Sequence, residues 1–263
     1  MTRHGLLGDT HGNANTVLAA LRRFQKEGIT QILQVGDFGV WPGNHGSTFL
    51  SYVNKVLAKN GQTLYVTPGN HEDYDQINSW YIHDDGWARA REHILVAPRG
   101  LRWTWEGVSF VSLGGAPSVD RRWRVENEKR GARKSWWAEE DITDADIVKV
   151  TSGGHADVMV AHDAPYGVPS IERRIAGNPN GFHPDDLKYS DQGRQKMYNV
   201  VDIVRPKVFL HGHYHFVVDD KLEIFNENTG LPDTVRIIGM NADGAYGTCG
   251  VLTLPELQVD FWG

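Results

Sequence analysis

Apolar runs alternate with helix-spaced apolar positions through the first third of the chain. Three runs, each followed by polar residues, are typical of buried strands and lie at residues 5–9, 31–37 and 63–70. Between the first two runs, apolar residues recur at helical spacing from Val17 to Phe24, and the pattern stops at Gly28. A second helix is predicted over residues 47–59. Strands that alternate with helices in this way predict βαβ units and an α/β fold.

The rest of the chain is predicted to add strands, two helices and two long loops. Strand patterns lie at residues 93–98, 101–105, 108–115, 157–165, 207–213, 216–225, 234–241 and 251–261. Thr143 and Asp146 form a capping-box pattern that opens a short helix, and another helix is predicted over residues 190–204. Residues 117–141 and 166–189 show no clear period and are expected to be loops. Because no repeat or composition break marks a linker, residues 1–263 are expected to form one domain.

Polar residues gather where five of the predicted strands end. These blocks are Asp9-Thr10-His11, Gly36-Asp37, residues 69–72, His162-Asp163 and residues 212–215. In open α/β sheets, ligands bind at the edge formed by the carboxyl ends of the strands. We therefore expect the five blocks to converge on one crevice, with the loops 117–141 and 166–189 lying over it.

Composition narrows the chemistry that this crevice can support. The 263 residues include 12 histidines but only one cysteine, Cys249, which excludes an internal disulfide and a thiolate metal cage. With 27 Lys and Arg against 33 Asp and Glu, the net charge of −6 disfavours extended nucleic acid as a partner. The chain shows neither an apolar signal core nor a run of about 18 apolar residues, so we expect a cytoplasmic protein with no membrane partner.

The side chains of these blocks are suited to binding metal ions. Carboxylates and imidazoles that converge without lysine need a compensating positive charge, which divalent ions supply. Nitrogen and oxygen donors favour Mn²⁺, Fe, Zn²⁺ or Mg²⁺ over metals that prefer thiolates. The candidates are too many for one tetrahedral site, which indicates two ions about 3.5–4 Å apart that share a carboxylate. The candidate ligands are Asp9, His11, Asp37, Asn70, His162, His213 and His215.

In type and order, the five blocks resemble the motifs of the calcineurin-like metallophosphoesterase superfamily. They read GDTHGN, GDFG, GNHE, AHDAP and HGHYH, and they span residues 8–215. The resemblance implies a four-layer αββα sandwich of two mixed β-sheets flanked by helices, with a dinuclear metal centre at the strand ends. By the same resemblance, Asp37 bridges two metals, of which one is held by Asp9, His11 and His215 and the other by Asn70, His162 and His213.

The resemblance also implies a reaction. In the family, a hydroxide held by the two metals attacks phosphorus, and a histidine outside the ligand set contacts the phosphate and helps the leaving group depart. His71 matches that histidine. In the second block, GDFGVWPG stands where the protein phosphatase branch has GDxxDRG, so the phosphate-binding arginine of that branch is missing. The stretches GGAPSVDRRWR and SWWAEE are instead similar to small bacterial and phage members that act on compact phosphoesters.

These features favour a phosphodiesterase that acts on small phosphoesters, with cyclic nucleotides among the candidate substrates and Mn²⁺ as the expected metal. A phosphomonoesterase or a nucleotide pyrophosphatase is the alternative enzyme, because the dimetal core suits all three. A non-enzymatic scaffold of this fold is expected to have lost ligands, whereas every ligand position is filled here. Substrate contacts are expected from Arg122, Trp136, Trp137 and Tyr166, unless the tryptophans only anchor their loop and the arginine is solvated.

Overall fold

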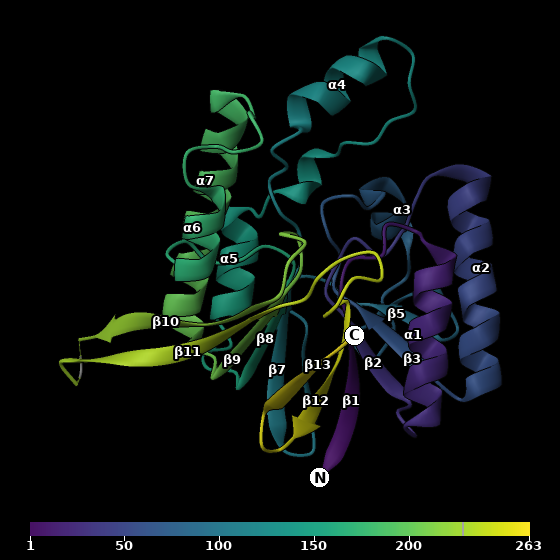
Figure 1. Cartoon of the computed structure of the whole chain (residues 1–263), viewed down its shortest axis with the longest axis horizontal. Helices are drawn as coiled ribbons and strands as arrows, with labels where there is room; N and C mark the ends of the chain where they lie inside the picture. The colour runs from purple at the N-terminus through teal and green to yellow at the C-terminus, as the bar shows by residue number, and fades with distance from the viewer. Residues whose placement is uncertain (228) are drawn as a thin grey trace.

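Two β-sheets packed face to face form the centre of the molecule, and helices cover both outer faces (Figure 1). The structure is a computed structural model that describes residues 1–227 and 229–263. The first sheet has the order β13 (Gln258–Trp262), β12 (Cys249–Leu254), β1 (Thr2–Leu7), β2 (Gln31–Gln34), β3 (Thr63–Val66), β5 (Ile94–Val96) and β4 (Ala88–Arg91). The second has the order β10 (Val218–Asn226), β11 (Leu231–Gly239), β9 (Val208–His211), β8 (Val158–Ala161), β7 (Val108–Leu113) and β6 (Arg102–Trp105).

Each sheet has parallel strands in the middle and antiparallel strands at its edges. In the first sheet β1, β2, β3 and β5 are parallel, and in the second β7, β8, β9 and β11 are parallel. Helices α1 (Ala14–Lys26) and α2 (Gly43–Asn60) lie on one side of the molecule, and α5 (Asp144–Thr151), α6 (Pro169–Ile175) and α7 (Pro184–Val204) lie on the other (Figure 1). The predicted four-layer sandwich of two mixed sheets is thereby confirmed.

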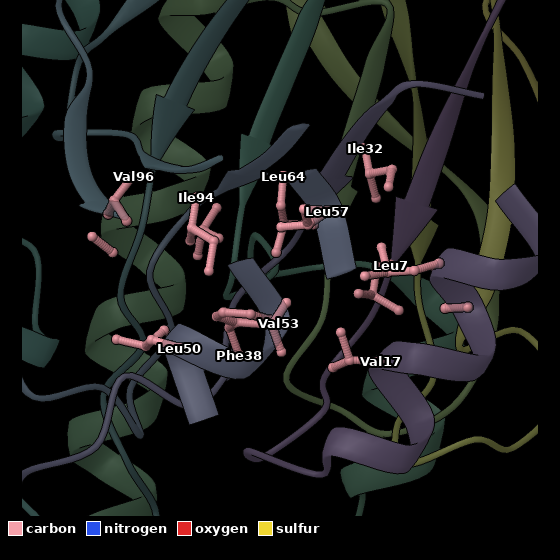
Figure 2. Close-up of a cluster of buried hydrophobic side chains, with 14 of the residues drawn as sticks. Leu7, Val17, Ile32, Phe38, Leu50, Val53, Leu57, Leu64, Ile94 and Val96 are labelled. Atoms are coloured by element: carbon pink, nitrogen blue, oxygen red, sulfur yellow. The ribbon is translucent and has the colours of Figure 1, made fainter. Parts of the chain in front are cut away.

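Three apolar layers hold these elements together. Leu7, Val17 and Leu50 belong to the cluster that joins the first sheet to α1 and α2 (Figure 2). A second cluster joins the other sheet to its helices, and a third, which includes Leu33 and Phe110, fills the space between the two sheets. Burial of these side chains removes apolar surface from water and is the main force that fixes the sheets relative to each other.

Helix boundaries follow from local capping. The Asn13 side chain accepts hydrogen bonds from Asn15 N and Thr16 N and so begins α1. Thr143 and Asp146 form the predicted capping box at the start of α5. Helix α2 ends at Gly61, which has a φ of +65° that glycine adopts without strain.

The structure corrects three of the sequence-based boundaries. Helix α2 begins at Gly43 rather than at residue 47; the sequence did not indicate its first turn, GNHG, because these residues show no apolar period. The segment 117–141 is not a simple loop, since it contains α4 (Arg121–Lys129) and a short 3₁₀ helix, η1 (Ala138–Glu140). The segment 166–189 contains α6 and the first turn of α7. These stretches escaped prediction because they are hydrophilic on most faces.

The fold brings the carboxyl ends of the parallel strands of both sheets to the same end of the molecule. The N-terminus lies at the opposite end, and α4 stands beyond the end toward which β1 runs (Figure 1). A remaining short helix, α3 (Tyr74–Ser79), follows β3 and its polar block. Within the described parts of the chain, no helix has the length and hydropathy that a bilayer crossing requires.

Candidate metal centre

The predicted ligands do converge at this end of the two sheets. Asp9, Asp37 and Asn70 follow β1, β2 and β3, while His162 follows β8 and His213 follows β9. Gly36 permits this close approach, because a Cβ atom on it would lie 2.2 Å from Nδ1 of His162. The strand ends of the two sheets therefore form one cluster.

Two groups of donor atoms share one carboxylate. The first group, whose donor atoms all lie within 4.8 Å of one another, consists of Asp9, His11, Asp37 and His215. The second consists of Asp37, His162 and His213. Asp37 belongs to both: its Oδ2 is 3.5 Å from Nε2 of His11 and 3.3 Å from Nε2 of His162. The amide oxygen of Asn70 is 2.9 Å from the same Nε2 of His162, which places Asn70 beside the second group.

The buried carboxylates of this cluster fit divalent cations. Asp9 is fully buried, and its Oδ1 has no hydrogen-bond partner among the described residues. Burial raises the pKa of Asp9. Burial also opposes the charge of Asp37, but the combined effect of His162, His71 and His11 outweighs it, so the pKa of Asp37 lies well below its usual range. An orphaned, buried acceptor beside a second carboxylate is the arrangement that a bound cation stabilises.

Second partners orient the imidazoles toward this cluster. Nδ1 of His162 is 2.8 Å from the carbonyl oxygen of Val35, and Nδ1 of His11 is 3.1 Å from a carboxylate oxygen of Asp243. In both rings Nε2 is left to face Asp37. Such partners fix the tautomer and the direction of a histidine that binds metal. Asp243 lies far from the motifs in sequence, so nothing in the sequence pattern indicated it.

Backbone strain is concentrated at the same residues. A positive φ is uncommon for residues other than glycine and persists only where surrounding structure enforces it. Four of the candidate ligands have one, namely His11 (43°), Asp37 (52°), His213 (70°) and His215 (55°). The loops after the strands are therefore held in costly conformations that direct these side chains inward.

Glu72 holds the loop that carries Asp37. Its carboxylate accepts hydrogen bonds from Phe38 N at 2.6 Å, Gly39 N at 3.3 Å and Val40 N at 2.7 Å. Asp37 itself accepts a 2.8 Å hydrogen bond from His71 N through Oδ1. Burial raises the pKa of Glu72 to about 7. Sequence analysis placed Glu72 in the GNHE block but gave it no role, and the structure shows that it fixes this loop.

Residues of segment 117–141 contact the side chains of Asn70 and His71. Asn70 donates through Nδ2 to Ser118 Oγ at 2.8 Å, and Ser118 in turn donates to the buried carboxylate of Glu140. Nη2 of Arg124 lies 2.5 Å from Nε2 of His71. The sequence analysis gave none of these three residues a supporting role, because the segment lacks the periodicity that would have placed it.

His71 lies at the mouth of the cluster rather than within it. Its Nε2 is 4.0 Å from Oδ2 of Asp37, and its ring meets that of His11 edge to face with centroids 5.6 Å apart. Burial lowers the pKa of His71 to about 4, and the guanidinium of Arg124 acts in the same direction. His71 is thus a neighbour of the ligand set with a neutral imidazole.

A pocket of about 640 Å³ opens beside the cluster. One wall carries His71 and four of the candidate ligands, and the other comes from residues 174–194. The second wall includes Arg174, Ile175, Phe182, Leu187, Asp191 and Arg194. The volume of the pocket is in the range of pockets that hold small ligands.

The expected substrate-binding residues are mostly elsewhere. Trp136 and Trp137 line a separate surface cleft, and Trp137 is a buried anchor (3% exposed) that donates from Nε1 to Asp75 at 2.8 Å. The placement of these indoles supports the alternative of a tryptophan-anchored segment over that of a substrate contact. The guanidinium of Arg122 is hydrogen-bonded to His183, with Nη1 of Arg122 2.8 Å from Nδ1 of the imidazole.

Tyr166 lies next to the pocket without lining it. Its ring is 5.2 Å from the guanidinium carbon of Arg194, which does line the pocket. Phe182, from the segment 166–189, is one of the aromatic residues that line this pocket. Sequence analysis did not select Phe182, because a single aromatic residue in a segment rich in Gly, Pro and Asn carries no distinctive pattern.

Comparison with known proteins agrees with this geometry. A family model described as calcineurin-like phosphoesterase matches residues 3–217. One crystal structure is similar over 98% of this chain and 97% of its own, with 12% identity and a TM-score of 0.51, which shows a shared fold. The protein TT1561 of Thermus thermophilus aligns over 99% and 98% of the two chains, with 10% identity and a TM-score of 0.48. An archaeal phosphodiesterase aligns over 99% and 98%, with 11% identity and a TM-score of 0.44. No curated protein sequence matches.

Proposed function

Because this chain belongs to the calcineurin-like phosphoesterase family, we propose that it is a dimetal hydrolase that cleaves small phosphodiesters, cyclic nucleotides among them. The observation that carries the proposal is the buried carboxylate of Asp37, shared by two groups of donor atoms. Asp9, His11 and His215 would hold one ion, and Asn70, His162 and His213 the other. The donors are all nitrogen and oxygen, which suits Mn²⁺ first and Fe, Zn²⁺ or Mg²⁺ as alternatives. When bound, such ions supply Lewis acidity and neutralise charge on phosphate oxygens.

The charge of the pocket supports a monoanionic substrate. Apart from Asp37, the charged residues that line it are two acids, Asp120 and Asp191, and two arginines, Arg174 and Arg194. Arg194 is already paired with Glu172 and Asp191. A phosphomonoester dianion would call for additional fixed cations near the metals, whereas a diester carries one negative charge. The near balance of charge therefore favours a diester.

The far wall of the pocket supports an organic leaving group of moderate size. Phe182, Ile175 and Leu187 offer apolar contacts, and Asn180 offers an amide to a polar edge. An aromatic ring with hydrogen-bonding groups, such as a nucleobase, combines both kinds of surface. Phe182 takes the stacking role that the sequence analysis had given to tryptophan.

The complete ligand set argues against a scaffold without activity. A binding protein has no need for two groups of donors of which four lie on strained backbone, since each positive φ costs of order 1–3 kcal/mol. Retention of this arrangement at four of the candidate ligands is explained by metal binding.

The test is hydrolysis by protein that has been stripped of metal and reloaded. Chelator-treated protein should be inactive, and two equivalents of Mn²⁺ should restore activity. We expect a higher kcat/KM for bis-nitrophenyl phosphate than for mono-nitrophenyl phosphate. A preference for the monoester would contradict the diesterase assignment, while two bound metals without hydrolysis of any phosphoester would contradict the enzyme itself.

A further inference from the structure

Arg124 is a buried guanidinium directly behind the pocket. Its side chain is 2% exposed, and each of its three nitrogens contacts a partner within the protein. Nε donates to Asp120 at 2.9 Å, and Nη1 donates to the carbonyl oxygens of Asn70 at 3.3 Å and Ser135 at 3.2 Å. Nη2 approaches Nε2 of His71 at 2.5 Å. Arg124 thus connects helix α4 to the ligand Asn70 and to the histidine at the mouth of the cluster.

The contact between Arg124 and His71 determines which ring nitrogen carries the proton. A guanidinium has only donors, so Nε2 of His71 must act as the acceptor. An imidazole whose Nε2 lone pair accepts a hydrogen bond is neutral and carries its single proton on Nδ1. Among the described residues, none forms a hydrogen bond with Nδ1 of His71, and His71 is one of the residues that line the pocket. The Nδ1–H group is therefore the one that can meet a ligand there.

We propose that Arg124 is a positioning residue that holds His71 as the Nδ1–H tautomer, so that His71 donates a hydrogen bond to the phosphate group of the substrate. This inference rests on the proposed phosphoesterase function for the identity of the substrate. No proton is transferred in this role: the Nδ1–H group orients the phosphate and stabilises its negative charge. The charge of Arg124 polarises the imidazole and makes Nδ1–H a stronger donor.

Two observations separate this role from direct binding of substrate. Arg124 does not line the pocket, whereas its partner Asp120 does. Its charge is also compensated locally, by Asp120 at 2.9 Å and by the buried carboxylate of Glu140 at 4.0 Å. Arg124 consequently acts on substrate through His71. Lysine cannot replace it, because one ammonium cannot reproduce the planar fork that spans four partners.

The first test reads the tautomer in the wild-type protein, with no need for activity. In protein loaded with diamagnetic Mg²⁺, ¹⁵N spectra of the histidine rings should show a protonated Nδ1 and an unprotonated Nε2 for His71. The signals are assigned by their loss in His71→Asn. A proton on Nε2 overturns the proposal. Because this readout involves no substrate, failure of the proposed hydrolysis leaves it intact.

The second test is a double-mutant cycle in the Mn²⁺-loaded enzyme. Arg124→Lys should lower kcat about 10–100-fold, as loss of a partner behind a catalytic group does, with KM nearly unchanged. In a His71→Ala background the same substitution should change kcat by less than about twofold, because the two residues act as one unit. Arg130→Lys is the matched control, since Arg130 is exposed next to the same helix and, among the described residues, forms an ion pair with Glu126 alone. Equal losses in both backgrounds, or a loss confined to KM, overturn the proposal.

Folding of the variant is checked by its Tm and its bound Mn²⁺. Should Arg124→Lys fail to fold, the ¹⁵N result on the wild-type protein decides alone.

Discussion

The side chain of Asn70 is oriented by Ser118, whose Oγ accepts a 2.8 Å hydrogen bond from Asn70 Nδ2. Ser118 can accept there because its own hydroxyl proton is donated to Glu140, which also accepts from Ser118 N at 2.8 Å. With its amide nitrogen engaged, Asn70 presents its oxygen to the cluster, 2.9 Å from Nε2 of His162. A neutral amide could otherwise turn either end inward, and only the oxygen binds a cation.

Ser118→Ala should therefore weaken the metal site that contains Asn70. The amide of Asn70 would lose the acceptor that fixes its orientation, and such losses typically cost about 10–100-fold in metal affinity. Titration of metal-free protein with Mn²⁺, followed by calorimetry, measures this. Ser152→Ala, which lies at the exposed end of α5, serves as the control. An unchanged affinity in Ser118→Ala would show that the orientation does not depend on this contact.

Asp37→Ala should remove activity and reduce the bound metal from two ions, because Asp37 contributes to both groups of donors. Circular dichroism should show a retained fold, since the side chain follows a strand end and is not part of an apolar layer. Asn70→Ala should have a smaller effect, because one neutral ligand to one ion is lost. Metal analysis and hydrolysis of a nitrophenyl diester provide the measurements, and full activity with two bound metals in Asp37→Ala would contradict the shared carboxylate.

The sequence was informative about the candidate ligands for a physical reason. Strand periodicity places Asp9, Asp37 and His162 just after apolar runs, and parallel strands must end at one edge of a sheet. Ser118, Arg124 and Glu140 act from a hydrophilic segment whose placement depends on tertiary contacts alone, so local pattern could not reveal them. The role of Trp137 could not be predicted for a similar reason. An aromatic residue beside charged residues in a sequence is equally consistent with a surface that stacks on substrate and with a buried anchor.

His71→Ala should slow alkyl and nitrophenyl diesters by similar factors. The family resemblance implies that His71 helps the leaving group depart, and such acid catalysis would matter about 10²–10⁴-fold for a poor leaving group and little for an activated phenol. A neutral His71 that donates to the phosphate instead stabilises both reactions alike. The ratio of kcat/KM values for the two esters, measured with and without the substitution, distinguishes the two roles. A much larger loss on the alkyl ester would instead show that His71 acts as a general acid on the leaving group.

Phe182→Ala should raise KM for nucleoside phosphodiesters while it leaves bis-nitrophenyl phosphate almost unaffected. A base that stacks on an aromatic side chain gains about 1–3 kcal/mol, which corresponds to an increase of roughly tenfold or more in KM when the contact is lost. Trp123→Ala is the matched control, since Trp123 is an aromatic side chain on α4 that is 67% exposed and does not line the pocket. Equal KM values for Phe182→Ala and wild type would remove Phe182 from the substrate site.

Asp9→Asn should affect the metal-free and metal-loaded proteins in opposite directions. Because burial raises the pKa of Asp9, its ionised form destabilises the folded chain at neutral pH in the absence of a cation. Asparagine removes this charge, so the Tm of the metal-free variant should exceed that of metal-free wild type. The advantage should shrink as the pH falls and Asp9 itself becomes protonated. With Mn²⁺ present the order should reverse, because binding at about 100 times Kd adds about 2.7 kcal/mol to the free energy of unfolding of wild type and less to a variant that lacks a ligand. Thermal denaturation with chelator and with excess Mn²⁺ measures both, and a lower Tm for the variant under both conditions would mean that Asp9 stabilises the fold without metal.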